Sequence, residues 1–312
     1  MEVVSDLSDG MSGRINYMSA SFFEFHHILC KTENAVQHPV FGHLTLPQNP
    51  ANEPVPCIIA CHGSRGWREH HETHMKNWLD AGFAVFKIHS FDSRKINSIV
   101  EDQMMVTHAM MISDAFQALN ILCTHPLIDS SKIAVTGWSL GGTVALYSAW
   151  LPIAEKLSPT GNRFAAHLPF YPAAHMRPEE PRWSNSPILI MHGEIDDYTP
   201  LQLVKGLEEN LQRTDANIEL VVFPEAHHSF DSLEETHWLE KAIRLDHRTV
   251  EIDLEGNMSG EIEPGERIPL NEPAQRFAAF QRVQNIGAHA GGQQYAREES
   301  QSRSIEFFSR VL

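Results

Sequence analysis

The chain has 312 residues, an ordinary globular composition and a formal net charge of −16, which suits one large domain or a domain with an appendage. A surface this acidic repels nucleic acid and anionic membranes, so we expect neither as a partner. No apolar run approaches the ~20 residues of a membrane-spanning helix, and residues 1–13 lack the apolar stretch of a secretory signal.

Short apolar runs alternate with helix-like segments over most of the chain. We expect residues 1–21 to form a loose leader and residues 22–230 to form the core. Short apolar runs separated by segments with apolar residues at helical spacing predict a mostly parallel sheet with helices on both faces. The expected strands lie at 57–61, 83–88, 133–136, 164–170, 188–191 and 218–223, and the expected helices at 71–80, 100–123, 139–150 and 201–211.

The pattern changes after the core. Residues 231–292 form an inserted segment, and residues 293–312 should form an amphipathic helix that closes the core. The glycine and asparagine in the middle of the insertion indicate a turn between two strands. Its expected elements are a helix over 233–245, a strand over 250–254, a turn at 256–257 and a return strand before Pro264.

A G-x-S-x-G motif follows the strand expected at 133–136. Residues 137–141 read Gly-Trp-Ser-Leu-Gly, and a helix of small and apolar residues comes next. In this setting the glycines leave room for a strained turn that exposes the serine hydroxyl, and the helix N-terminus favours negative charge on a reacting oxygen. The motif predicts Ser139 as the nucleophile of an α/β-hydrolase fold. The alternative is a tight strand–helix turn in which Ser139 only caps the helix.

A serine nucleophile of this kind needs a histidine base and an acid that orients it. In this fold the chain order is serine, acid, histidine. Glu194, Asp196 and Asp197 follow one expected strand, and His227 and His228 follow the next. Parallel strands bring such loops together at one edge of the sheet. The residues alone leave the choice within each set open, although neighbouring loop residues point in different directions and only one of each should serve.

Four motifs between residues 41 and 230 are similar to those of one known family. They are residues 62–66 (His-Gly-Ser-Arg-Gly), the turn around Ser139, residues 193–196 (Gly-Glu-Ile-Asp) with Pro200, and residues 226–230 (Ala-His-His-Ser-Phe). On these motifs the chain resembles the dienelactone hydrolase family, and the likeness resumes in the closing helix.

The resemblance implies a choice among the acids and bases. In the family the acid lies four residues before the proline, which implies Asp196, and the histidine lies two before the phenylalanine, which implies His228. Founding members of the family carry a cysteine nucleophile where this chain has Ser139. The resemblance therefore implies hydrolysis of a carboxylic ester or lactone, without implying dienelactone itself.

Two backbone N–H groups are expected to bind the oxyanion. In this fold they belong to the residue after the nucleophile and to the loop after an early core strand, which here are Leu140 and Ser64. Trp138, directly before the nucleophile, is a candidate substrate contact.

Arg94 follows the strand expected at 83–88, at a position similar to that of a family arginine that binds a substrate carboxylate. An arginine can hold a carboxylate through two parallel hydrogen bonds. The alternative is an ion pair with Asp92 or Glu101 within the protein.

Several histidines cluster in the sequence without matching a metal-binding motif. His70, His71 and His74 lie on the helix expected at 71–80 or just before it, but their spacing differs from H-E-x-x-H. We expect them to be exposed helix residues, and we expect the same for His26 and His27.

The four cysteines also indicate no metal site. Cys57 and Cys61 lie roughly 13 Å apart on a strand, which is too far for a disulfide, and no C-x-x-C pair is present. We expect the cysteines to be reduced and buried, the protein to be cytoplasmic, and no metal or other cofactor to be required.

Together these features predict a serine hydrolase that cleaves a small-molecule carboxylic ester or lactone through an acyl-enzyme. The alternatives are a peptidase or amidase of the same fold, or a non-catalytic binding protein. The insertion at 231–292 begins three residues after His228, so we expect it to pack beside the pocket and to help set substrate size. The alternative for the insertion is a role in oligomerisation or stability.

Overall fold

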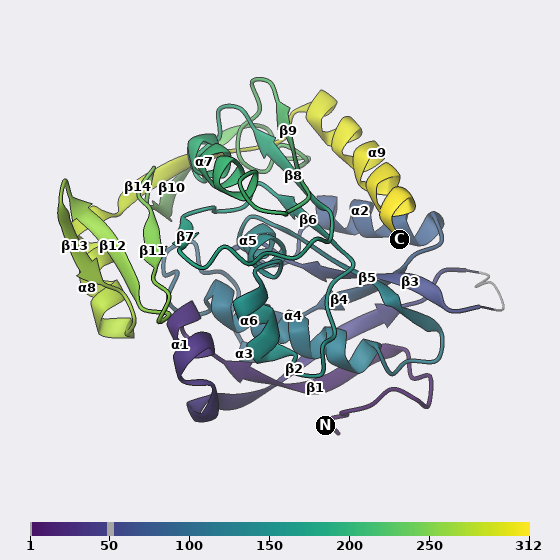
Figure 1. Ribbon diagram of the computed structural model, residues 1–312. Helices are drawn as coiled ribbons and strands as arrows, with labels where there is room; N and C mark the ends of the chain where they lie inside the picture. The colour runs from purple at the N-terminus through teal and green to yellow at the C-terminus, as the bar shows by residue number, and fades with distance from the viewer. Residues whose placement is uncertain (1, 49–52) are drawn as a thin grey trace.

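The computed structural model describes residues 2–48 and 53–312, and its centre is an eight-stranded sheet (Figure 1). The neighbouring strands from β4 to β9 are all parallel, whereas β1 and β2 extend one edge in antiparallel fashion. In spatial order the strands are β1 (Gly13–Ser21), β2 (Val36–Thr45), β4 (Ala84–Ile88), β3 (Val55–Cys61), β5 (Ile128–Trp138), β6 (Ala166–Phe170), β8 (Ile188–Gly193) and β9 (Ile218–Phe223).

Helices cover both faces of this sheet, as the apolar runs predict. On β3 the side chains of Cys57, Ile59 and Cys61 join one apolar cluster, and those of Ile58 and Ala60 join the other. One face carries α1 (Phe25–Cys30), α4 (His108–Leu122), α5 (Leu140–Tyr147), α6 (Leu151–Leu157) and α7 (Leu201–Leu211), and the other carries α2 (Glu69–Asp80) and α9 (Gln294–Val311). Two short helices, η1 (Thr32–Asn34) and α3 (Ser90–Arg94), lie in connections.

The prediction of a loose leader at 1–21 is wrong for its second half. Residues 13–21 are β1, which pairs along its whole length with β2. Ile15 and Tyr17 are fully buried, and the Tyr17 hydroxyl donates to the Asp114 carbonyl at 3.1 Å. The alternation of these two apolar residues was the local signal for a strand, but its partner lies more than twenty residues further along the chain.

The helix expected at 100–123 is shorter than predicted. It begins at His108, because the Thr107 side chain accepts a hydrogen bond from the Met110 N–H at 3.3 Å and caps the helix. The preceding residues form turns, and Val106 within them is fully buried. Apolar residues at helical spacing thus extended beyond the helix itself.

The helix predicted at 233–245 is instead a strand. Residues from His237 to Arg244 form β10, which pairs antiparallel with β14 (Asn285–Ala290). Leu233 and Trp238, which suggested a buried helix face, are exposed. The backbone of this segment is extended because a partner strand some fifty residues later supplies its hydrogen bonds, and no local pattern reveals that pairing.

The rest of the insertion is a small sheet with one helix. The predicted strand at 250–254 is observed as β11 (Val250–Ile252), and the return strand before Pro264 is β12 (Met258–Glu263). β11 also pairs in parallel with β7 (Met176–Pro178), a strand that precedes β8 in the core. The insertion is completed by β13 (Glu266–Pro269) and α8 (Pro273–Val283), and Figure 1 shows it at one end of the molecule.

All four cysteines are free thiols, but they are not all buried. The prediction holds for Cys57 and Cys61 and is wrong for Cys30, which is exposed and donates to the Glu255 carbonyl at 3.0 Å. Within residues 2–48 and 53–312, no helix is both long enough and apolar enough to span a bilayer.

Candidate active site

Ser139 stands in a strained turn between β5 and α5. Its backbone φ is 55° and its ψ is −110°, a conformation that residues with a side chain rarely adopt. A Cβ on Gly137 would lie 2.4 Å from the Gly141 carbonyl oxygen, and one on Gly141 would lie 2.1 Å from the Cys61 carbonyl oxygen. The two glycines of the motif are therefore required for the turn to pack against β3.

Three loops at the carboxyl ends of parallel strands bring Ser139, His228 and Asp196 together. The Ser139 Oγ lies 2.9 Å from His228 Nε2, and His228 Nδ1 lies 2.7 Å from Asp196 Oδ2. Because an ionised carboxylate only accepts hydrogen bonds, Nδ1 carries the proton and Nε2 is free to accept one from the serine. The arrangement is a continuous hydrogen-bonded chain that ends at the half-buried Ser139 hydroxyl.

Asp196 is held by several donors besides the histidine. Its Oδ1 accepts from the N–H groups of Tyr198 and Thr199 at 2.9 and 2.8 Å, and the Thr199 hydroxyl donates to Oδ2 at 2.9 Å. Burial by itself would raise the pKa of this carboxyl, but the His228 imidazole beside it and these hydrogen bonds bring the pKa below its ordinary value. Asp196 is therefore ionised at neutral pH.

The sequence neighbours of these residues point elsewhere. Asp197 accepts from His289 through both the Nδ1 atom and the backbone N–H, each at 2.8 Å. The His227 ring lies beside the His289 ring, with centroids 5.1 Å apart. Glu194 accepts from a backbone N–H at 3.0 Å. Of the candidate acids and bases, only Asp196 and His228 face Ser139.

Two cavities meet at Ser139. The larger measures about 140 Å³, similar to cavities of ~150 Å³ that accept a benzene molecule. A smaller one of about 50 Å³ lies beside His228. Ser64, Ser139 and Tyr198 line both of them. The wall of the larger cavity includes these insertion residues: Ile243, Leu245, Val250, Met258, Leu270, Phe280 and Val283.

Ser64 and Leu140 are the residues whose N–H groups the sequence predicts as oxyanion donors. Both line the larger cavity with Ser139, and Leu140 is the first residue of α5. The Ser64 loop is a tight turn in which the Gly66 N–H donates to the Gly63 carbonyl at 3.0 Å. The Ser64 carbonyl is also held, since it accepts from the Ile99 N–H at 2.9 Å. This pinned backbone suits a fixed donor position.

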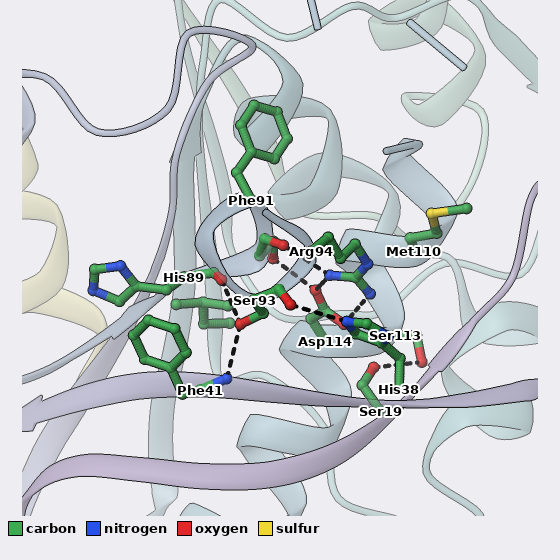
Figure 2. Close-up of polar contacts among 12 residues, drawn as sticks. Ser19, His38, Phe41, His89, Phe91, Ser93, Arg94, Met110, Ser113 and Asp114 are labelled. Atoms are coloured by element: carbon green, nitrogen blue, oxygen red, sulfur yellow. Dashed lines mark hydrogen bonds and ion pairs between the residues drawn. The ribbon is translucent and has the colours of Figure 1, made fainter. Parts of the chain in front are cut away.

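Arg94 does not occupy the predicted position at the pocket. Figure 2 shows its guanidinium in a two-pronged ion pair with Asp114, with Nη1–Oδ2 and Nη2–Oδ1 distances of 2.7 and 2.9 Å. The Ser90 hydroxyl donates to the same carboxylate at 2.6 Å. Both charged side chains are buried, and Arg94 lines neither cavity. Its partner is Asp114 rather than Asp92 or Glu101, so the structure does not place Arg94 where the predicted contact with a substrate carboxylate requires it.

Trp138 mainly packs beneath the turn that carries Ser139. Its side chain is fully buried, and its indole N–H donates to Asp231 Oδ2 at 2.9 Å. The residue lines only the smaller cavity. Asp231 also accepts from the Tyr171 hydroxyl at 2.7 Å, and the Tyr171 ring lies edge-on to His228 with centroids 4.7 Å apart. One buried carboxylate thereby connects the nucleophile turn to the histidine loop.

The histidines of α2 are buried, which corrects the expectation of exposed residues. His74 Nε2 lies 3.1 Å from Asp231, and the His71 ring stacks on Trp138 with centroids 4.3 Å apart. Burial lowers the pKa of His71 well below its ordinary value, so it is neutral. His70 is buried as well. His71 and His74 pack against Trp138, the residue before Ser139, because α2 covers this face of the sheet.

The expectation of exposure is also wrong for His26, which is buried and bonded through Nδ1 to the Gly256 carbonyl at 3.0 Å. His27 is half-buried. Both histidines belong to α1, where His26 contacts the turn between β11 and β12. The helix therefore helps to hold the insertion.

The sequence reasoning missed two groups near the cavities. Tyr198 lines both cavities, its ring centroid lies 4.8 Å from that of His228, and burial raises its pKa to about 12. Its position just after the strand end that carries Asp196 was an available signal. Glu24 also lines the larger cavity, where it is ion-paired with Arg276 of α8 and lies 3.1 Å from His108. Only the fold brings these three together.

A mostly parallel sheet, a serine in a strained strand–helix turn and an adjoining Ser–His–Asp chain define an α/β-hydrolase. The sequence model of the dienelactone hydrolase family matches residues 41–251. The chain therefore belongs to the dienelactone hydrolase family.

Similar proteins agree with this class of fold. The Caenorhabditis elegans protein "Dipeptidyl peptidase family member 1" is 24% identical over 139 residues, which are 39% of this chain and 17% of that protein. The Yersinia pestis protein "Putative carboxymethylenebutenolidase" is 28% identical over 109 residues, 33% of this chain and 39% of that protein. The matches thus span less than half of either relative. A solved "Putative Dienelactone Hydrolase" from Klebsiella pneumoniae has a TM-score of 0.50 and 18% identity, and covers 70% of this chain and 88% of that one.

Proposed function

We propose that the protein hydrolyses a small-molecule carboxylic ester or lactone through an acyl-enzyme on Ser139. The observation that carries the proposal is the hydrogen-bonded chain from Asp196 through His228 to Ser139, which ends where two cavities meet. Membership of the dienelactone hydrolase family supports the same reaction class. The first curated relatives extend well beyond the matched regions, so their names do not decide the substrate.

In the proposed mechanism His228 Nε2 takes the proton from Ser139 as its Oγ attacks the ester carbonyl. The N–H groups of Ser64 and Leu140 hold the oxyanion, and each such donor is worth roughly 3 kcal/mol in comparable sites. The protonated histidine then gives its proton to the leaving alcohol, and the acyl group stays on the serine. Asp196 keeps the proton of the resting imidazole on Nδ1 and stabilises the imidazolium.

The second half of the reaction repeats these roles with water. His228 takes a proton from a water molecule that attacks the acyl carbonyl, and the tetrahedral intermediate again rests on the two backbone N–H groups. Collapse of the intermediate returns the proton from His228 to Ser139 and releases the carboxylic acid. In a lactone the alcohol and the acid belong to one molecule, so the product is a hydroxy acid.

The insertion sets the size of the substrate group that fits the larger cavity. Its apolar residues from β10, β12 and α8 line the same cavity as Ser139. A cavity of about 140 Å³ suits one small ring or a short alkyl chain next to the scissile ester. These lining residues support a role of the insertion in substrate size, and the β11–β7 pairing supports an additional contribution to stability.

The test is labelling with a fluorophosphonate probe, followed by a panel of esters, lactones and amides. We expect stoichiometric labelling of the wild type at Ser139 and none of a Ser139→Ala variant. Hydrolysis should be found for esters or lactones with one small apolar group. A protein that takes no label and turns over no ester would be a binding protein of this fold, and turnover of amides alone would make it an amidase.

A further inference from the structure

A second cluster of polar side chains lies next to the proposed catalytic residues and has no part in the proposed reaction. It consists of Asp197, His227 and His289, and one donor atom from each lies within 4.8 Å of the others. The three residues come from separate segments: the loop after β8, the loop after β9, and β14 of the insertion. Neither the family match nor the proposed reaction assigns this cluster a role.

The contacts within the cluster leave one buried nitrogen without a partner. Asp197 Oδ2 accepts from His289 Nδ1 at 2.8 Å. The His227 ring lies beside the His289 ring at an interplanar angle of 32°. Its Nδ1 atom is buried and finds no hydrogen-bond partner among the described residues. A buried polar atom without a partner is uncommon in folded proteins and calls for an explanation.

The surroundings hold the cluster in place and leave it accessible. The Asp197 and His289 side chains are 34% and 44% exposed, so an ion can reach them from solvent. The Trp238 ring lies edge-on to His289 with centroids 4.8 Å apart, and the Asp197 backbone carbonyl accepts from Arg244 at 3.4 Å. The Arg244 charge is already paired with Asp246, so it does not neutralise the Asp197 carboxylate.

We infer that Asp197, His227 and His289 bind a divalent transition-metal ion, with zinc as the preferred ion. Two imidazoles and one carboxylate are a donor set that suits zinc and similar ions, with water in the fourth position. Ligand atoms of a tetrahedral zinc ion lie roughly 3.4 Å apart. Since the donor atoms lie within 4.8 Å of one another, no separation has to close by more than about 1.4 Å, a shift that side-chain rotation of half-exposed residues provides.

The bound ion joins the insertion to the two loops that carry the proposed acid and base. Asp197 follows Asp196 directly and His227 precedes His228, while His289 lies on β14. The ion therefore acts as a clamp that fixes the insertion beside the cavity. This inference rests on the cluster alone and holds whether or not Ser139 is a nucleophile.

The experiment measures metal binding by the full-length protein after treatment with a chelator and desalting. Zn²⁺ affinity is determined by competition with a chromophoric chelator, and Co²⁺ is used for its visible absorption. We expect one equivalent of either ion to bind, with a tetrahedral Co²⁺ spectrum. His289→Gln should weaken Zn²⁺ binding by about 100-fold or more, since even partners behind the ligands contribute 10–100-fold. Asp197→Asn should have the same effect.

The matched control is His237→Gln on β10. This histidine lies on the same two-stranded sheet, is partly exposed and faces one carboxylate, Glu234, at 3.8 Å. Its replacement should leave Zn²⁺ affinity unchanged. Thermal unfolding gives a second readout, because Zn²⁺ should raise the Tm of the wild type and of the control but not that of His289→Gln.

Two results would overturn the inference. One is the absence of stoichiometric binding by the wild type, and the other is binding that Asp197→Asn and His289→Gln leave intact. Far-UV circular dichroism of both variants checks that any loss is not due to unfolding. Fluorophosphonate labelling of the same samples reports separately on Ser139, so a failure of the metal site and a failure of the proposed reaction are distinguishable.

Discussion

The same two loops present the same two residue types twice, one position apart, with different outcomes. Asp196 and His228 face Ser139, whereas Asp197 and His227 face His289. The inner pair is almost completely buried, while the Asp197 side chain is 34% exposed. The comparison shows that residue type and loop position do not decide function, because direction and burial differ between adjacent residues.

Burial explains why only the inner pair suits proton transfer. Asp196 keeps its charge in a buried position because two backbone N–H groups, a hydroxyl and the imidazole all donate to it. Such fixed donors hold a histidine in one tautomer and one orientation. Asp197 has the His289 side chain and backbone as partners, so its surroundings suit ligand exchange better than a rigid relay.

The largest expected effect comes from removing the proposed nucleophile, Ser139, which is hydrogen-bonded to His228 of the inner pair. Ser139→Ala should lower kcat by about 10⁶-fold and leave the fold intact, because the attacking oxygen is lost. The measurement is ester hydrolysis at saturating substrate, with circular dichroism as the check of folding. Hydrolysis at the wild-type rate would contradict the assignment of Ser139.

Next come the two histidines. His228→Ala should reduce kcat severely, by an amount close to that of the serine change, because the general base and acid are removed together. His227→Ala should have a mild effect, under about tenfold, because its ring does not reach Ser139. Steady-state kinetics of both variants decide between them. If His227→Ala were the more damaging change, His227 rather than His228 would be the base.

The two aspartates should show the same contrast, with a smaller loss of kcat. Asp196→Asn should lower kcat by about 10⁴-fold, because the amide no longer holds the proton on His228 Nδ1. Asp197→Asn should again stay under about tenfold. Both rates are measured with one short ester at neutral pH. Equal losses in the two variants would show that the loop as a whole, and not Asp196, carries the effect.

A third acidic residue extends the comparison to stability. Burial alone would raise the pKa of Glu24, but Arg276 and His108 lower it to about 2 from an ordinary value near 4.5. Because the pKa is lowered on folding, the stabilisation of about 3 kcal/mol is present above pH 4.5 and disappears as the pH falls towards 2.

Glu24→Gln should therefore lower the free energy of unfolding at pH 7, and its difference from the wild type should shrink below pH 4.5. Denaturant unfolding between pH 2.5 and 7 measures this, with the exposed Glu33→Gln as the control. A difference that is constant over this range would show that ionisation of Glu24 contributes nothing.

The smallest effect concerns the wall of the larger cavity. Ile243 lines the cavity, whereas Trp238 on the same strand packs against His289 of the Asp197–His227–His289 cluster. Ile243→Ala should change the ratio of kcat/KM for bulky and short esters by roughly tenfold, because it enlarges the cavity. Trp238→Ala should leave that ratio unchanged. The reverse result would place the substrate on the outer side of β10.

Local patterns in the sequence were sufficient for the parallel core and for the prediction of Ser139, whereas the choice of Asp196 and His228 also needed the family resemblance. Short apolar runs marked β3, β4, β5, β6, β8 and β9, since a strand buried on both faces needs apolar residues throughout. The motif around Ser139 could be recognised locally, because its two glycines are needed for the tight turn itself. Chain order and the family spacing then selected Asp196 and His228, because catalytic loops follow strand ends.

Only the tertiary structure decided features whose partners are remote in the chain. β1 and β10 are strands because β2 and β14 pair with them, and Arg94 is unavailable to substrate because Asp114 of α4 holds it. The cluster of Asp197, His227 and His289 likewise forms only when the insertion returns to the core. Periodicity and motifs depend on residues close together in the sequence. Hydrogen bonds and ion pairs between distant segments depend instead on how the whole chain packs.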